Sequence, residues 1–388
     1  MIKVGSLFSQ VLSLVNRHDF SRAVKQWDAE KGAKGFRCWD QFVAMVFGQL
    51  AGADSLREIE GGLSTALGKL RHLGLKQAPA RSTLSYANEH RPYQLFETMF
   101  YYLSDQAQTL AAGQKRRFRF KNPLVSIDAS TIELCLSLYD WARFRRKKGA
   151  VKLHLMLNHQ GCLPQWAWLT DGKVHDVKMA KTLEFEPGTI VAVDRGYIDY
   201  DLFDYWTGEG VWFVTRAKKN MAYRVVKTRD IPDYGNILRD EEIEFTGYDA
   251  SHKYPHRLRR IVVWDDENQR EIVLLTNHMN FAASTIGRIY KDRWQIELFF
   301  KAIKQTLKIK TFVGTSENAV QIQIWTALLC MLILKILQMR STFGWSLSNL
   351  AAMLRFNLLT YRDLWVWLNK PYQTPAIGPP EGQLLLFE

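Results

Sequence analysis

The hydrophobic and polar residues of this 388-residue chain change their period near residue 120. Before about residue 110, apolar residues recur at helical spacing, as in 42–50, and Gly and Pro stand between the periodic stretches. After Pro123, short apolar runs typical of buried strands replace this pattern. We therefore expect a helical domain over 1–120 and an α/β region from residue 121 onward.

Five short apolar runs in the α/β region predict strands, at 124–127, 151–158, 162–170, 189–193 and 211–215. Helical segments at 176–183 and 200–207 separate the later runs. Three strands followed by alternating strand and helix are typical of a mixed sheet with flanking helices. The predicted core is therefore a five-stranded mixed α/β sheet.

The remainder of the chain predicts an insertion and a helical end. Residues from about 218 to 283 are rich in charges and Tyr, with one strand pattern at 271–276, and they predict a β-rich insertion. Helical patterns cover 284–310, 317–338 and 346–355. We place the α/β domain at 121–335 and a C-terminal helical region at 336–388, which ends in a loose Pro- and Gly-rich tail at 371–382.

Composition indicates a folded, basic protein. Lys and Arg number 52 against 39 acidic residues, a net charge of +13 that favours a polyanionic partner such as nucleic acid. The four scattered cysteines form no CxxC pair, which argues against a zinc ribbon and fits a reducing cytoplasm. The apolar run at 324–334 is about half of a membrane span, so we expect a buried helix there and no membrane partner.

Three segments suit contact with DNA, although each has an ordinary structural interpretation. Residues 55–59 and 82–91, with Asp54 and Ser82 as helix caps, resemble a helix-turn-helix, but many helical bundles share this pattern. The basic stretch 114–121 suits either a phosphate backbone or a solvated linker. The basic run 143–148 suits either DNA or a solvated loop.

Two aspartates follow runs of buried-type residues. Asp128 ends Val-Ser-Ile-Asp, and Asp194 ends Val-Ala-Val-Asp. An ionised carboxylate beside a buried strand is costly unless a cation or a hydrogen-bond donor compensates it. Neighbouring strands can bring two such carboxylates to one metal ion, but capping of a turn explains each of them equally well.

A third acid lies in the predicted helix 284–310, within a patterned group of side chains. Tyr290, Arg293, Glu297 and Lys304 are spaced three, four and seven residues apart, which places them on a stripe about 60° wide. A solvated face with an Arg293–Glu297 pair is the simpler interpretation. Four residue types at defined spacing favour instead a metal-ligating carboxylate beside phosphate-binding groups.

These residues resemble the DDE transposases of bacterial insertion-sequence family four. The pattern Tyr290-x2-Arg293-x3-Glu297-x6-Lys304 matches the tyrosine-arginine-glutamate-lysine signature of that family. Asp128 in Ser-Ile-Asp-Ala-Ser-Thr and Asp194 in Ala-Val-Asp-Arg-Gly-Tyr match the first and second catalytic aspartates. The resemblance covers residues 121–335 and implies an RNase H-like core that includes the insertion.

The resemblance also implies a mechanism and partners. Asp128, Asp194 and Glu297 would hold two divalent ions, Mg²⁺ with Mn²⁺ as a substitute, for phosphoryl transfer. Tyr290, Arg293 and Lys304 would grip the DNA phosphate beside the cleaved bond. The expected partners are transposon ends and target DNA, bound by a homodimer on paired ends in the bacterial cytoplasm, near the nucleoid.

The insertion departs from its relatives in one respect. Some relatives have a base-binding tryptophan in the last strand of the insertion, whereas 271–276 contains none, although Trp212 and Trp264 lie nearby in the sequence. Two other functions are compatible with the acids. One is an RNase H-like nuclease without strand transfer, which has no need of the Tyr-Arg-Lys stripe, and the other is a DNA-binding regulator descended from a transposase, which has no need of three acids.

Overall fold

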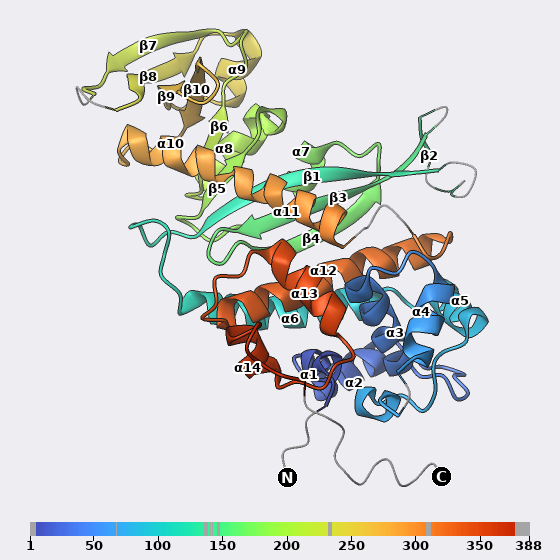
Figure 1. Ribbon diagram of the computed structural model, residues 1–388. Coiled ribbons are helices and arrows are strands. Elements are labelled where there is room, and N and C mark those ends of the chain that lie inside the picture. The colour runs from blue at the N-terminus through green and yellow to red at the C-terminus, as the bar shows by residue number, and fades with distance from the viewer. Residues whose placement is uncertain are drawn as a thin grey trace, which may run out of the picture. The chain divides into compact units, whose positions relative to one another are not determined.

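The computed structural model describes residues 5–66, 68–135, 139, 141, 143–145, 148–231, 235–307 and 312–376 (Figure 1). The chain forms two compact units. Unit 1 comprises 1–113, 132–150 and 301–388, and unit 2 comprises 114–131 and 151–300. The three-domain division expected from the sequence stays a prediction, and its tail at 371–382 lies partly outside the described residues.

Unit 1 is mainly helical. Its helices are α1 Leu7–Leu12, α2 Arg17–Gln26, α3 Cys38–Ala51, α4 Leu56–Ser64, η1 Leu70–Leu73, α5 Arg81–His90, α6 Gln94–Ala112, α12 Glu317–Arg340, α13 Leu347–Asn357 and α14 Leu364–Asn369. Helix α12 packs against α3, α5, α6 and α13. It is long and apolar enough to cross a membrane, yet 89% of its most apolar window is buried by its neighbours. A helix that is apolar on all sides forms the core of a bundle, so the predicted buried helix is confirmed.

Unit 2 is built on a mixed sheet. The strands are β1 Leu124–Leu134, β2 Arg143–Arg145, β3 Lys148–Asn158, β4 Leu163–Asp171, β5 Ile190–Val193, β6 Trp212–Arg216, β7 Tyr223–Thr228, β8 Ile237–Phe245, β9 Leu258–Asp265 and β10 Arg270–Thr276. Their helices are α7 Asp176–Ala180, η2 Arg195–Tyr197, α8 Tyr200–Gly208, α9 Tyr248–Lys253, α10 Ala283–Asp292 and α11 Trp294–Thr306. Of the strands, β2 and residues 132–134 and 148–150 of β1 and β3 belong to unit 1. The sheet runs β2-β3-β1-β5-β6-β10-β9-β8-β7, and β4 also pairs with β3.

All five predicted strands are present, but the prediction of a five-stranded sheet is wrong. In the described part of the chain the sheet has ten strands, because β10 pairs antiparallel with β6 and continues it into β9, β8 and β7. The β-rich insertion therefore extends the sheet from its β6 edge. A free edge strand exposes unpaired backbone groups, and β10 satisfies those of β6.

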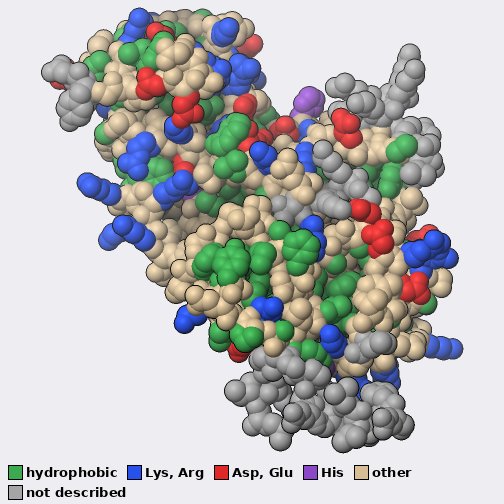
Figure 2. Space-filling model, viewed as in Figure 1, with side chains coloured by type: hydrophobic (Ala, Val, Ile, Leu, Met, Phe, Trp, Pro, Cys, Tyr) green, Lys and Arg blue, Asp and Glu red, His purple; other side chains and the backbone are tan. Residues whose placement is uncertain are grey.

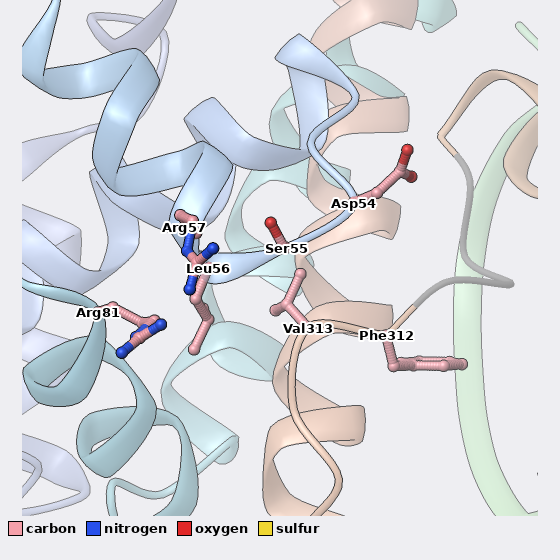
Figure 3. Close-up of a pocket in the computed structure, with 7 residues that line it drawn as sticks. All are labelled: Asp54, Ser55, Leu56, Arg57, Arg81, Phe312 and Val313. Carbon is pink, nitrogen blue, oxygen red and sulfur yellow. The ribbon is translucent and has the colours of Figure 1, made fainter.

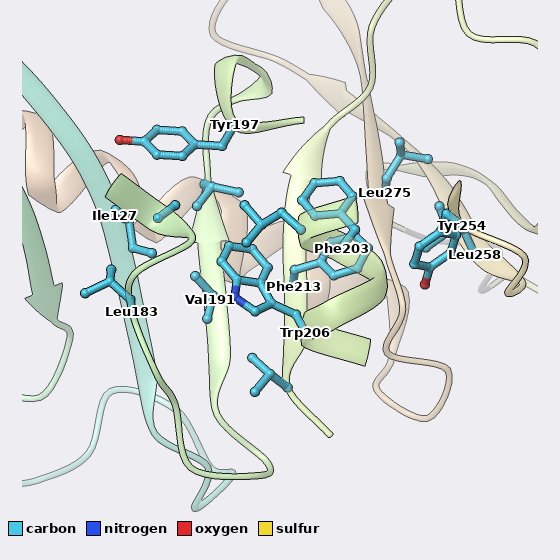
Figure 4. Packing of buried hydrophobic residues seen from close by; sticks show 14 of the residues in the cluster. Ile127, Leu183, Val191, Tyr197, Phe203, Trp206, Phe213, Tyr254, Leu258 and Leu275 are labelled. Atoms are coloured by element: carbon cyan, nitrogen blue, oxygen red, sulfur yellow. The ribbon is translucent and has the colours of Figure 1, made fainter. Parts of the chain in front are cut away.

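The centre of unit 2 has a hydrophobic core on each face of the sheet. Strands β1 and β5 pair in parallel, starting with Leu124 opposite Ile190. Because side chains alternate along a strand, Val125 and Val191 enter a core with α8 (Figure 4), whereas Leu124 and Ile190 enter a core with α10. Alternate residues of β1 and β5 are therefore directed toward α10.

Candidate functional site

The register of β1 and β5 places the two predicted aspartates side by side. The last paired residues are Ile127 and Val193, and Asp128 and Asp194 follow them directly. By alternation, both aspartates take the α10-facing direction of Leu124. The expectation that Asp128 ends its strand is wrong, since β1 continues to Leu134. The apolar signal stops at Asp128 because the next residues are only half-buried.

The carboxyl group of Asp128 lies in a largely desolvated position. Its side chain is 23% exposed, and its Oδ1 accepts a 2.8 Å hydrogen bond from the backbone N–H of Ala129. Burial raises the pKa of Asp128 to about 6, against the lowering effects of that hydrogen bond and of Arg293. The nearby carboxylates of Glu297 and Asp194 raise it further. A positive charge beside Asp128 is therefore needed to keep it ionised at low cost.

Asp194 directs the chain out of β5 into a short turn. It is the N-cap of η2, and its Oδ1 accepts a 2.6 Å hydrogen bond from the N–H of Gly196. The turn carries Tyr197 into the core shared with α8, where its side chain is 2% exposed. One carboxylate oxygen of Asp194 thus has a structural role.

The junction of α10 and α11 corrects the prediction of a single helix over 284–310. Helix α10 ends at Asp292 and α11 begins at Trp294, with Arg293 between them. Hydrogen bonding tightens there, because the N–H of Ile296 donates to the carbonyl of Arg293 at 3.1 Å. The side chain of Arg293 is turned inward and is 8% exposed. Residues 308–310 of the predicted helix lie outside the described residues.

Arg293 connects three of the predicted site residues. Its Nη2 donates a 2.6 Å hydrogen bond to Glu297 Oε1, and its Nη1 lies 3.8 Å from Asp128 Oδ2. Its guanidinium carbon lies 5.6 Å from the ring centre of Tyr290. Burial lowers the pKa of Arg293, but the hydrogen bond to Glu297 and the charges of Tyr290, Glu297 and Asp128 together outweigh burial, so the pKa is raised. Arg293 therefore supplies the positive charge between the two acids.

The three acids do not form a closed metal-binding group. Among the described residues, no three His, Cys, Asp or Glu side chains converge closely enough to hold one metal ion. The donor chemistry nevertheless suits a hard cation, because Asp128, Asp194 and Glu297 offer carboxylate oxygens. Two buried N–H groups, at Nε and Nη1 of Arg293, have no hydrogen-bond partner in the described structure. Lys304 lies seven residues beyond Glu297 on α11, in unit 1.

A buried hydrogen-bond network links the elements that carry this site. His159 Nε2 lies 2.7 Å from Ser126 Oγ, and its Nδ1 lies 2.6 Å from Asp292 Oδ2. Arg117 Nη1 pairs with the other Asp292 oxygen at 2.6 Å. Ser126 precedes Asp128 by two residues on β1, and Asp292 directly precedes Arg293. The network therefore fixes the strand of the first acid to the helix junction.

A fourth acid stands beside the site. Asp176, which begins α7, pairs with Lys152 Nζ at 3.1 Å and lies 3.6 Å from His154 Nδ1. Burial lowers the pKa of His154 to about 4, so this histidine is neutral at pH 7. The side chains of the basic run 143–148 lie outside the described residues.

Sequence reasoning missed several of the residues that shape the site. His159 and Asp292 are separated by 133 residues, so no local pattern joins them. Tyr197 had a signal, since it completes the Asp-Arg-Gly-Tyr segment that begins with Asp194. Strand β10 lacks the base-binding tryptophan of some relatives. Trp264 lies on the neighbouring strand β9, directly opposite Glu271 of β10.

Unit 1 contains a separate open pocket of about 390 Å³ (Figure 3). Its lining residues are Asp54, Ser55, Leu56, Arg57, Arg81, Phe312 and Val313. Helix α4 is capped by Ser55 rather than Asp54, through a 3.2 Å hydrogen bond from the N–H of Glu58, and the N-cap of α5 is Ala80 rather than Ser82. Arg57 and Arg81 approach the pocket from α4 and α5, the two segments of the suggested helix-turn-helix.

Comparison with known proteins gives consistent matches. Residues 119–333 match the transposase DDE domain, and 4–76 match DUF4372, a domain of unknown function. A protein named as a transposase in Sinorhizobium fredii is 32% identical over 67% of this chain and 72% of its own length. One named as a transposase for insertion sequence element IS5377 of Geobacillus stearothermophilus is 27% identical over 71% and 72%. The piggyBac transposase synaptic complex with hairpin DNA has a TM-score of 0.43 at 9% identity, over 99% of this chain and 84% of that chain.

Proposed function

Because this chain belongs to the DDE transposases of insertion sequences, a family of enzymes that act on DNA, we propose that it cuts the ends of its own mobile element and joins them to target DNA. One observation carries the proposal. Arg293 holds Glu297 at 2.6 Å and Asp128 at 3.8 Å, and Asp194 follows the strand that pairs with β1. In this proposal strands β4, β3, β1, β5 and β6 are the RNase H-like core.

Divalent cations complete the site in this proposal. The DDE domain is associated with divalent metal ions in general, and we assign two Mg²⁺, with Mn²⁺ as a substitute, to Asp128, Asp194 and Glu297. When bound, such ions activate a water or 3′-hydroxyl and stabilise the leaving oxygen of an in-line displacement. The chain supplies the oxygen ligands and shields much of Asp128, whose side chain is 23% exposed, from bulk water. Arg293 compensates the charge of two of these acids.

The role of Tyr290, Arg293 and Lys304 is to hold the DNA phosphate next to the cleaved bond. Arg293 has two buried nitrogen atoms, Nε and Nη1, without a hydrogen-bond partner among the described residues. A buried donor without a partner is costly, and a phosphate oxygen is a strong acceptor for it. The packing of Arg293 beside Tyr290 supports the same role. Lys304 is included by its place in the family signature.

Several features of the assembly belong to the same proposal. The helical N-terminal domain binds the element ends, and the active form is a homodimer on paired ends. A net charge of +13 supports a polyanionic partner and a place on the nucleoid in the cytoplasm.

The experiment that tests this function uses the DNA that flanks the gene. The purified protein is incubated with the flanking inverted repeats, target DNA and Mg²⁺, and the products are separated on denaturing gels. Cleavage at the repeat ends followed by joined products is the expected result. Cleavage without joined products would indicate a nuclease, and binding without cleavage would indicate a DNA-binding regulator.

A further inference from the structure

The basic connector, residues 114–121, has two chemically different sides. Phe118 and Phe120 are half-buried, whereas Lys115, Arg119 and Lys121 are exposed. Residues 117–120 lie in bends, and within them the two aromatic side chains face the protein while the neighbouring basic side chains face solvent. Lys and Arg side chains stand out over the segment between α6 and β1 (Figures 1 and 2).

A row of aromatic rings fixes the connector to unit 2. The rings of Phe118 and Phe120 stack at 5.0 Å, and Phe120 stacks on Phe281 at 4.9 Å. Phe281 in turn stacks on His278 at 3.8 Å. Aromatic pairs at these separations stabilise a fold beyond the area they bury. The connector is therefore held in place, unlike a free solvated linker.

Two arginines extend this arrangement. Arg117 pairs with Asp292 at 2.6 Å, which joins the connector to the residue before Arg293. Arg288 of α10 places its guanidinium carbon 5.3 Å from the ring centre of Phe118 and is itself exposed. The contacts of Phe118, Phe120 and Arg117 therefore hold the backbone that carries the exposed basic side chains, beside the residue that precedes Arg293.

We propose that the exposed side of the basic connector binds the sugar-phosphate backbone of duplex DNA. A row of cations at alternate residues suits repeated phosphates, and each neutralised phosphate releases counterions. A backbone held by packed aromatic rings loses less conformational entropy on binding than that of a mobile linker. This proposal rests on the proposed function, because it takes DNA as the partner.

The test is the salt dependence of DNA binding by Arg119→Gln/Lys121→Gln. With a short duplex of random sequence, the slope of log affinity against log salt should become less steep by about 2, since two phosphate contacts are lost. The control, Lys227→Gln/Lys253→Gln, also removes two exposed positive charges from unit 2 and should keep the wild-type slope. Equal slopes in wild type and the connector variant, or equal changes in both variants, would overturn the proposal. Wild-type protein that binds no DNA would instead contradict the proposed function.

An independent observation concerns the hydroxyl of Tyr197. The ring is packed in the core beside Ile127 and Val191, and the hydroxyl points out of that core (Figure 4). The Oη atom is buried and forms no hydrogen bond in the described structure, although the side chain is only 2% exposed. A buried hydroxyl without a partner costs stability, so its retention needs a reason.

The surroundings of this hydroxyl point to the acids. Burial raises the pKa of Tyr197, and the carboxylates of Asp128, Asp176 and Asp194 raise it further, so the phenol is protonated and is a donor. Carboxylates are its natural acceptors. Ligating carboxylates in metal sites are commonly held by hydrogen bonds from neighbouring donors.

We infer that Tyr197 is a positioning residue, whose hydroxyl donates a hydrogen bond to Asp128 or Asp194 when divalent cations bind these acids. The inference rests on the proposed function, which assigns the cations. It explains why a hydroxyl without a partner is kept at this position, since its acceptor is oriented only in the loaded site.

The test compares Tyr197→Phe with Tyr254→Phe, a buried tyrosine of the same core. The Tyr254 hydroxyl lies 3.2 Å from Thr207 Oγ1, so its loss should lower the melting temperature and leave cation binding unchanged. Tyr197→Phe should weaken Mn²⁺ binding, followed by electron paramagnetic resonance of the free ion, by about 10–100-fold. Its melting temperature without cation should not fall.

Three outcomes separate this inference from the proposed function. Wild-type protein that binds Mn²⁺ through Asp128, with unchanged affinity in Tyr197→Phe, would overturn the role of Tyr197 alone. A lower melting temperature for Tyr197→Phe at unchanged affinity would show a purely structural hydroxyl. Wild-type protein without Mn²⁺ binding would contradict the proposed metal site itself.

Discussion

Arg293 donates a 2.6 Å hydrogen bond to Glu297, and the same guanidinium lies 3.8 Å from Asp128. These two contacts of Arg293 join the first turn of α11 to strand β1 of the sheet. Because Arg293 is buried and always charged, it balances two acids in a desolvated site. The Nε and Nη1 atoms of Arg293 form no hydrogen bond in the described structure, which makes this residue the centre of the proposed phosphate contact.

Arg293→Ala and Lys304→Ala should reduce end processing after the first nick more than they reduce nicking itself. The second step requires the cut end to be held, and a charge-assisted contact to phosphate is stronger than a neutral one. Time courses of nicked, doubly cut or hairpin, and joined products give the measurement. Lys291→Ala, which removes an exposed lysine of α10 paired with Glu267, should leave the profile unchanged. Equal loss of every product from Arg293→Ala would indicate general DNA binding only.

His159→Phe should lower the free energy of unfolding by about 3 kcal/mol, since it leaves the buried groups of Ser126 and Asp292 without their partner. Chemical denaturation measures this loss. His256 also pairs with an aspartate, but both side chains are nearly half exposed. His256→Phe should therefore cost less than about 1 kcal/mol. Similar losses in the two variants would show that the His159 network does not stabilise unit 2.

The stability of the protein should fall as the pH is lowered from about 6.5 to about 4. Burial, with a contribution from Arg259, lowers the pKa of His278 to about 4. The unfolded chain therefore takes up a proton in this interval that the folded chain does not, so acidification favours unfolding. His278→Asn keeps an acceptor for the N–H groups of Asn280 and Phe281 and should show a smaller decrease. Chemical denaturation at several pH values measures this decrease. An identical pH dependence of stability in wild type and variant would exclude His278 as its source.

Local sequence patterns were sufficient for the elements that carry the site. Apolar runs bounded by turns predicted five strands, and in β5 all four side chains are buried, which imposes a continuous hydrophobic sequence. The run 324–334 gave the buried helix α12 for the same reason. The two aspartates were noted because each directly follows such a run, and the patterned group around Glu297 then favoured a metal site over capping.

Local sequence patterns did not predict that β6 pairs with β10. These strands are distant in the sequence, and edge pairing depends on backbone groups rather than on side-chain type. The break at Arg293 was missed because the helical period continues across it, while the contacts that turn Arg293 inward come from Asp128 and Glu297. Long-range contacts, not local propensity, shaped these features.

Cleavage of the flanking inverted repeats by three single variants tests the central claim most directly. Asp128→Ala, Asp194→Ala and Glu297→Ala should each abolish Mg²⁺-dependent cleavage and retain binding to end DNA, because each removes a proposed metal ligand. Glu244→Ala removes a half-buried acid of the insertion, which pairs with Arg224 and Arg257, and should cleave as wild type does. Near-normal cleavage by any of the first three variants would contradict the assignment of that residue to the metal site.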